Sequence, residues 1–141
     1  MTSIVVDASV ALAWYLSESF SGAAHVWRSK LDGQQFTFIV PQLHYWEFAN
    51  ALRTKIRRKI LDAGSASVIW KAHLAAPLHM IDPSREDVLA TALEYDATAY
   101  DAVYITLALE LDAPLLTAER ATTPWVKKLG ARAISIAALP S

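Results

Sequence analysis

The fold class is decided by the stretch Ser3-Ile-Val-Val-Asp-Ala-Ser-Val-Ala-Leu-Ala-Trp-Tyr-Leu16. Residues 3–7 form a short apolar run rich in β-branched side chains, which is typical of a buried strand, and residues 10–16 have the pattern of a helix. The alternation continues to the other end of the chain. Strands are predicted at 36–40, 78–81, 114–117 and 132–136, and helices from Pro41 to about Ile60, from Gly64, after the capping box Ser84-Arg-Glu-Asp87, over 99–111, and after Thr123 and Pro124. This order predicts an α/β fold with a mainly parallel sheet that is covered on both faces.

The predicted helix Ala99-Tyr-Asp-Ala-Val-Tyr-Ile-Thr-Leu-Ala-Leu-Glu-Leu111 carries a carboxylate, Asp101, in its first turn. The side chains that follow leave almost no polar face, so this helix should be covered by protein on both sides. Burying an ionised carboxylate is costly unless a cation or several hydrogen-bond donors compensate it. Asp101 therefore indicates a metal site as the first hypothesis.

Length and composition predict one domain that spans residues 1–141. The chain has 141 residues, of which 54% are hydrophobic, and this suits a single core. No apolar stretch approaches the roughly 20 residues of a membrane span, and the start of the chain lacks the features of a secretory signal. We therefore expect a cytoplasmic protein without a membrane partner.

The composition also limits the metal chemistry. Without cysteine there is no disulfide, thiol nucleophile or cysteine-held zinc. His25, His44, His73 and His79 show no close metal-ligand spacing, so we assign them no role and expect a hard cation on oxygen ligands. A net charge of -1 argues against a broadly basic nucleic-acid binder but leaves room for a local basic patch.

Four acids stand at corresponding ends of the predicted elements. Asp7 ends the first strand, Glu119 follows the strand 114–117, and Asp101 begins its helix, so all three should reach the carboxyl edge of the sheet. Glu47 lies about two turns into the helix that starts at Pro41 and can point inward. Two ionised carboxylates about 4 Å apart repel each other by about 4 kcal/mol in a medium with a dielectric constant of about 20. If the four acids form a cluster, protons or divalent cations must therefore compensate their charge.

A site of this kind predicts hydrolysis of a phosphate ester, because Mg²⁺ polarises a phosphoryl oxygen and activates water. Each acid also has an ordinary structural explanation. Asp7 and Asp101 suit helix caps, Glu47 suits a pair with an arginine, and Glu119 suits the surface beside Arg120. The residues alone leave both interpretations open.

Four sequence blocks resemble the PIN-domain ribonucleases, specifically the VapC toxins of type II toxin-antitoxin systems. The blocks are Val5-Val-Asp-Ala-Ser9, Trp46-Glu-Phe-Ala-Asn-Ala-Leu52, Ala99-Tyr-Asp-Ala-Val-Tyr-Ile105 and Leu115-Leu-Thr-Ala-Glu119. Their order and spacing match the family over essentially the whole chain. The resemblance implies a three-layer α/β/α sandwich, an endoribonuclease that needs Mg²⁺ or Mn²⁺, a VapB-like antitoxin partner and a homodimer.

Carried over by position, the resemblance makes Asp7, Glu47, Asp101 and Glu119 the catalytic and metal-binding acids, with Asp7 and Asp101 the direct ligands. The family more often has aspartate where this chain has Glu119, so that side chain reaches the metal differently or acts through a water. Thr117 matches a frequent hydroxyl of the family, but we leave it outside the predicted site.

Basic and aromatic side chains are the candidates for holding RNA. The densest positive cluster follows Glu47 and comprises Arg53, Lys55, Arg57, Arg58 and Lys59. These cations suit phosphate contacts, an antitoxin interface, or simply the carboxyl end of a helix. The tryptophans Trp14, Trp27, Trp46, Trp70 and Trp125 suit base stacking, although aromatics at helical spacing more often belong to a core or a subunit interface.

The leading hypothesis is a metal-dependent endoribonuclease in which an activated water attacks an RNA phosphodiester. The alternative is a PIN-like scaffold with little or no activity that binds RNA or a protein partner, with Glu119 marking the loss. A phosphatase with Asp7 as a covalent nucleophile is disfavoured, since such enzymes carry a second aspartate where this chain has Ser9. Serine-hydrolase and nucleotide-binding motifs are absent from the sequence.

Overall fold

The structure is a computed structural model that describes residues 2–137. Within that range the strands form one sheet in the order β3-β2-β1-β4-β5, and every neighbouring pair is parallel. The strands are β1 (Thr2–Val6), β2 (Phe36–Val40), β3 (His79–Met80), β4 (Leu115–Thr117) and β5 (Ala133–Ser135). The predicted parallel sheet is thus confirmed, with each strand within two residues of its expected bounds.

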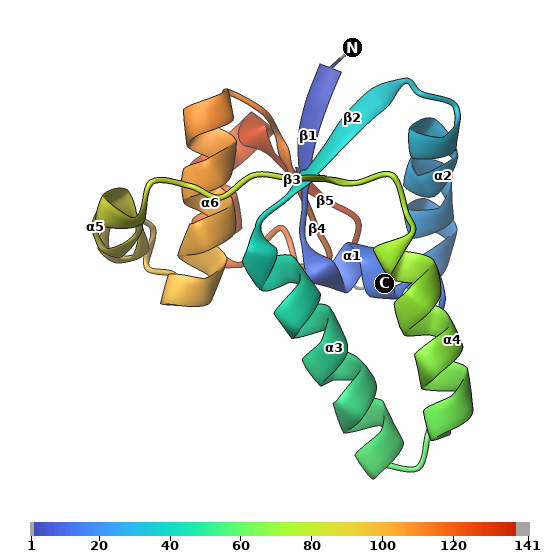
Figure 1. Cartoon of the computed structure of the whole chain (residues 1–141). Coiled ribbons are helices and arrows are strands. Elements are labelled where there is room, and N and C mark those ends of the chain that lie inside the picture. Colours follow the sequence, from blue (N-terminus) through green and yellow to red (C-terminus); the bar gives the residue numbers. More distant parts are fainter. Residues whose placement is uncertain (1, 138–141) are drawn as a thin grey trace.

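Helices cover both faces of this sheet (Figure 1). They are α1 (Ala8–Leu12), α2 (Ser21–Asp32), α3 (Gln42–Arg57), α4 (Ala63–Leu74), α5 (Arg85–Tyr95), α6 (Ala99–Leu111) and α7 (Pro124–Leu129), followed by the 3-10 turn η1 (Gly130–Arg132). Val5 packs with α6 and α7, whereas its neighbours Ile4 and Val6 pack with α1 and α2. This alternation along β1 gives two cores, one on each face of the sheet, and so confirms the three-layer α/β/α sandwich.

Helices α3 and α4 form a hairpin that extends away from the sheet (Figure 1). A third apolar cluster holds the hairpin against α1 through Ala11, Phe48, Leu52 and Ala66. Glu47 lies in the part of α3 that is nearest to the sheet, whereas the basic cluster lies at its far end. The hairpin therefore joins an acidic and a basic region.

Two helices begin with caps that come from distant parts of the chain. Pro41 precedes α3 and offers no side-chain cap, but the backbone N–H of Gln42 donates to Asp82 Oδ1 at 2.8 Å. The capping box predicted at Ser84 to Asp87 is wrong, because the backbone N–H of Ser84 donates to Glu110 on α6 instead. At the start of both α3 and α5, an acceptor remote in sequence thus satisfies one backbone N–H.

Helix α2 has no counterpart in the elements predicted from sequence. Only Ala24 and Leu31 are buried along it, and Val26 is exposed. A helix with so few buried positions lacks the apolar stripe on which recognition from sequence depends.

No helix in the described part of the chain is long and apolar enough to cross a membrane.

Candidate active site

The sheet order places the site at a change of direction in the chain. From β1 the chain first moves to β2 on one side and later returns to β4 on the other, so β1 and β4 lie side by side with their carboxyl ends at the same edge. Val6 pairs with Leu116, which sets Asp7 beside Thr117. Ligands of open α/β sheets bind at such switch points, where the loops after adjacent strands separate.

All four predicted acids line one cavity of about 560 Å³ at this edge. Asp7 follows β1, Glu47 lies in α3, Asp101 in the first turn of α6, and Glu119 two residues after β4. The remaining lining residues are Ala8, Ser9, Leu12, Phe20, Ala118, Arg120 and Thr123. The structure thus brings together side chains that are up to 112 positions apart in sequence, from Asp7 to Glu119.

Asp7 is the acid most strongly affected by its surroundings. Its pKa is raised to about 6, mainly by burial and in addition by the nearby charges of Glu47 and Asp101, against hydrogen bonds that lower it. Those bonds come from the Thr117 hydroxyl to Oδ2 at 3.0 Å and from the Ser9 N–H to Oδ1 at 3.5 Å. Ionised Asp7 therefore lacks full compensation from the protein.

Glu47 is held in place by a tyrosine from α6. The Tyr104 hydroxyl donates to Glu47 Oε1 at 2.7 Å. Burial raises the pKa of Glu47, and the Asp101 charge adds to this effect. Tyr104 itself is buried, and burial with the charges of Asp7 and Glu47 raises its pKa, so its proton stays on the phenol and remains available to Glu47.

Asp101 and Glu119 form the other side of the cavity. Thr98 caps α6 by accepting the Asp101 N–H at 3.0 Å, which directs the first turn toward the site. Burial raises the pKa of Asp101, and the Glu119 charge raises it further. The Glu119 side chain is exposed and accepts a long hydrogen bond, 3.4 Å, from the Thr123 hydroxyl.

Thr117 connects two of the acids. Its hydroxyl donates to Asp7 and accepts the backbone N–H of Glu119, also at 3.0 Å. The side chain is fully buried at the end of β4. Neither Thr117 nor Tyr104 belongs to the site that the sequence predicts. Tyr104 lies one turn after Asp101, and that spacing on one helix face was the available signal.

The cavity is negatively charged without a cation of the protein paired to it. In the part of the chain that the structure describes, the ion pairs are Arg28 with Asp32, Lys55 with Glu18, and Arg132 with Asp112, and none involves the four acids. The acids instead rely on neutral donors and on protonation. This is the electrostatic setting in which a divalent cation binds.

The donor set fits a hydrated hard cation. Among residues 2–137, no group of three or more histidine, aspartate or glutamate side chains is arranged to hold a metal ion jointly. Mg²⁺ does not need such a group, because it keeps several waters and binds through one or two carboxylates. The partly buried carboxylates Asp7 and Asp101, with raised pKa values, supply that number. The metal-binding role of the four acids, with Asp7 and Asp101 as the direct ligands, stays a prediction.

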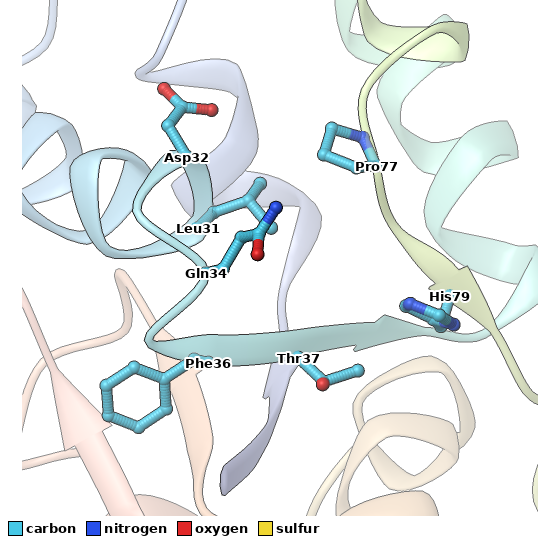
Figure 2. A pocket seen from close by; sticks show the side chains of 7 residues that line it. All are labelled: Leu31, Asp32, Gln34, Phe36, Thr37, Pro77 and His79. Atoms are coloured by element: carbon cyan, nitrogen blue, oxygen red, sulfur yellow. The ribbon is translucent and has the colours of Figure 1, made fainter. Parts of the chain in front are cut away.

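A second cavity, of about 440 Å³, lies near the amino end of β2 (Figure 2). Its walls come from the end of α2, the start of β2 and the segment before β3. The carboxylate in its lining, Asp32, already pairs with Arg28 at 3.1 Å. This cavity contains none of the four acids and offers no comparable cluster of charge.

Comparison with known proteins adds independent findings. The family model described as the PIN domain matches residues 4–122. Ribonuclease VapC3 of Pyrobaculum aerophilum is 33% identical over 121 residues, which cover 83% of this chain and 89% of the relative. The crystal structure of PAE2754 from the same organism superposes with a TM-score of 0.73 at 26% identity and covers 96% of this chain and 84% of that one.

A more distant structure shows the same fold. VapC20 of Mycobacterium tuberculosis, described as a toxin that cleaves the sarcin-ricin loop, superposes with a TM-score of 0.63 at 14% identity. The match covers 90% of this chain and 95% of that chain.

Proposed function

The chain belongs to the PIN-domain family and, within it, to the VapC proteins, and on this premise we propose that it is a Mg²⁺-dependent endoribonuclease, the toxin of a toxin-antitoxin pair. The observation that carries the proposal is the cavity lined by Asp7, Glu47, Asp101 and Glu119 at the switch point of the sheet. The naming of its relative as a ribonuclease supports RNA as the substrate.

In this proposal Asp7 and Asp101 hold the cation, and Glu47 and Glu119 complete the acidic lining and orient its water shell. When bound, Mg²⁺ or Mn²⁺ polarises a phosphoryl oxygen and activates water for attack on the phosphodiester. Thr117 holds Asp7 and Tyr104 holds Glu47 through the hydrogen bonds described above. Both contacts restrict the carboxylates to one orientation before substrate arrives.

The basic cluster at the end of α3 is proposed to bind the RNA backbone. Lys55 is engaged by Glu18 at 3.4 Å, whereas Arg53, Arg57, Arg58 and Lys59 are exposed. These side chains lie at the carboxyl end of α3 and directly after it, so a strand of RNA that enters the cavity can run along the helix that carries Glu47. Such contacts position the substrate without selecting its sequence.

Two protein partners belong to the proposal. A VapB-like antitoxin would inhibit the enzyme, and a second copy of the chain would form a homodimer. Exposed apolar side chains such as Leu89 and Leu93 on α5 are compatible with a covered surface. We also propose that the protein acts in the cytoplasm, on RNA present there. Light scattering of the purified chain gives its oligomeric state.

The test is cleavage of RNA with Mg²⁺ or Mn²⁺ by the wild-type chain and by Asp7→Asn and Asp101→Asn. Both variants should lose cleavage by about a hundredfold or more, as expected when a charge that holds the catalytic ion is removed. The matched control is Asp112→Asn at the opposite end of α6, where the left-handed backbone (φ 48°) also suits asparagine. Unchanged cleavage in either site variant would refute the proposal.

Thermal melting separates the enzyme from the inactive scaffold. A ligand of the native state stabilises it by RT ln(1 + [L]/Kd), so millimolar Mn²⁺ should raise the Tm of the wild-type chain and not that of Asp7→Asn. No shift, together with no cleavage of any RNA offered, would favour a PIN-like scaffold that binds RNA or protein without cutting.

A further inference from the structure

A series of hydrogen bonds connects Tyr15, which follows α1, through His73 on α4 and His44 on α3 to Val6, the last residue of β1. The Tyr15 hydroxyl contacts His73 Nδ1 at 3.1 Å, and His73 Nε2 contacts His44 Nε2 at 2.9 Å. His44 Nδ1 in turn contacts the carbonyl oxygen of Val6 at 3.1 Å. Both histidines are fully buried, and the His73 ring stacks on Phe48 with 4.0 Å between ring centroids. This pairing of two histidines is not visible in their sequence spacing.

The carbonyl oxygen of Val6 determines which atom donates in each hydrogen bond of this series. A carbonyl oxygen only accepts, so His44 Nδ1 carries a proton and donates to Val6. The pKa of His44 is lowered to about 4 and that of His73 to about 3, in both cases mainly by burial, so both rings are neutral and each has a single N–H. His44 Nε2 must then accept from His73 Nε2, and His73 Nδ1 must accept from the Tyr15 hydroxyl.

The Val6 end of this series of hydrogen bonds lies next to the acidic cavity. Val6 immediately precedes Asp7, and His44 stands one turn before Glu47 on α3. The two acids thus belong to segments that the Nδ1 hydrogen bond of His44 ties together. The other ring nitrogen faces α4 and makes no contact toward the site.

We propose that His44 is a positioning residue: its Nδ1–H bond to Val6 sets Glu47 relative to Asp7, and Tyr15 and His73 hold the ring in the required tautomer. This proposal rests on the proposed function, because it concerns the same acids. It assigns different tasks to the two nitrogens of His44. The Nδ1 side serves the site, and the Nε2 side serves the packing of α4.

Two amide substitutions separate these tasks. The side-chain nitrogen of asparagine lies near the place of Nδ1, whereas the amide of glutamine reaches the place of Nε2. His44→Asn can therefore keep the donor to Val6 and loses the bond to His73. His44→Gln can keep an acceptor for His73 and loses the donor to Val6. Both leave one buried partner unsatisfied, so a purely structural role predicts similar effects of the two.

The measurements are the Tm without metal, the Mn²⁺ dissociation constant of the RNA-free protein by calorimetry, and kcat and KM for RNA cleavage. Both variants should lower the Tm. His44→Gln should weaken Mn²⁺ binding about tenfold or more and lower kcat with little change in KM, in line with the effect of residues that orient metal ligands. His44→Asn should recover most of the Mn²⁺ affinity and most of kcat.

Equal Mn²⁺ affinity and equal kcat in the two variants would overturn the proposal. If His44→Gln does not fold, nitrogen NMR of the wild-type histidines carries the test. It should show His44 protonated at Nδ1 and His73 at Nε2, and the His44 Nδ1–H resonance should shift on saturation with Mg²⁺. The opposite tautomers, or no shift, would also overturn it. A wild-type chain that neither binds Mn²⁺ nor cleaves RNA refutes the proposed function itself.

Discussion

Asp7 is a side chain whose present environment disfavours the charge that its proposed function requires. Its pKa of about 6, against an ordinary 3.8, means that the folded protein binds a proton more tightly than the unfolded chain between those pH values. Stability of the metal-free protein therefore decreases as the pH rises from about 4 to about 6 through this group. Above pH 6 the full penalty remains.

Asp7→Asn should consequently stabilise the metal-free protein at pH 7. The pKa difference corresponds to at most about 3 kcal/mol at roughly 1.4 kcal/mol per unit, and part of it is offset by the weaker hydrogen bond from Thr117. We expect a net gain of about 1–2 kcal/mol in the free energy of unfolding, measured by urea denaturation without metal. The gain should shrink at pH 4, and a variant that is less stable at pH 7 would contradict this account.

Thr117 provides a second test at the scale of one residue. Thr117→Val keeps the shape of the buried side chain but removes the donor to Asp7 and the acceptor for the Glu119 N–H. We expect Mn²⁺ affinity to fall by about tenfold, as for other groups that orient metal ligands, and Thr117→Ser to restore it. Calorimetry with Mn²⁺ measures both.

The control for Thr117→Val is the same substitution at Thr106. Thr106 is also buried, and its hydroxyl has no hydrogen-bond partner among the described residues. Thr106→Val should leave Mn²⁺ binding as it is and should not lower stability, because no bond is lost. A similar loss of affinity in both variants would show that packing, rather than the Thr117 hydroxyl, governs the site.

At the scale of elements, the start of α3 depends on a residue 40 positions away. Asp82 accepts a hydrogen bond from the Gln42 N–H at 2.8 Å and so replaces the side-chain cap that Pro41 cannot provide. Asp82→Ala should cost about 1 kcal/mol in the free energy of unfolding, the usual cost of losing an N-cap acceptor. Asp82→Asn keeps an acceptor and should recover most of that loss in the same denaturation experiment. Equal stability of all three proteins would contradict the capping role.

The same elements show where sequence patterns suffice and where they do not. The apolar runs around Val5 and Ile39 predict strands correctly, because both strands are buried on both faces. A strand of this kind has apolar residues at consecutive positions, which can be recognised in the sequence. Helix α2 is not predicted from the sequence because it buries few side chains. The caps by Asp82 and Glu110 are not predicted either, because local capping rules contain no information about tertiary contacts.

At the scale of the whole molecule, topology explains why the acids of the site were foreseeable and their partners were not. The carboxyl ends of parallel strands converge, so Asp7 and Glu119 could be placed at one edge from the strand order alone. The bond between Tyr104 and Glu47 joins residues 57 positions apart, and the pairing of His44 with His73 spans 29. Such contacts depend on how helices pack over the sheet.

The buried histidine pair should also make the free energy of unfolding depend on pH in the acid range. His44 and His73 have pKa values of about 4 and about 3 in the folded protein, against 6.5 ordinarily, so the unfolded chain binds protons first as the pH falls. Their contribution is complete above pH 6.5 and is lost toward pH 4, by about 1.4 kcal/mol per pH unit for each histidine. The raised pKa values of Asp7, Glu47 and Asp101 act in the opposite direction over part of this range. The pKa values of the two histidines, however, lie further from their ordinary value than the pKa of Asp7 does.

The metal-free protein should therefore lose stability between pH 6.5 and 4, and Asp7→Asn should lose it more steeply because one of the opposing groups is gone. His73→Phe, which retains an aromatic ring against Phe48, should be less stable at pH 7 but should show a shallower slope, since one histidine no longer titrates. Urea denaturation at half-unit pH steps measures all three slopes. A slope in His73→Phe as steep as in the wild type would mean that groups other than this pair limit stability in acid.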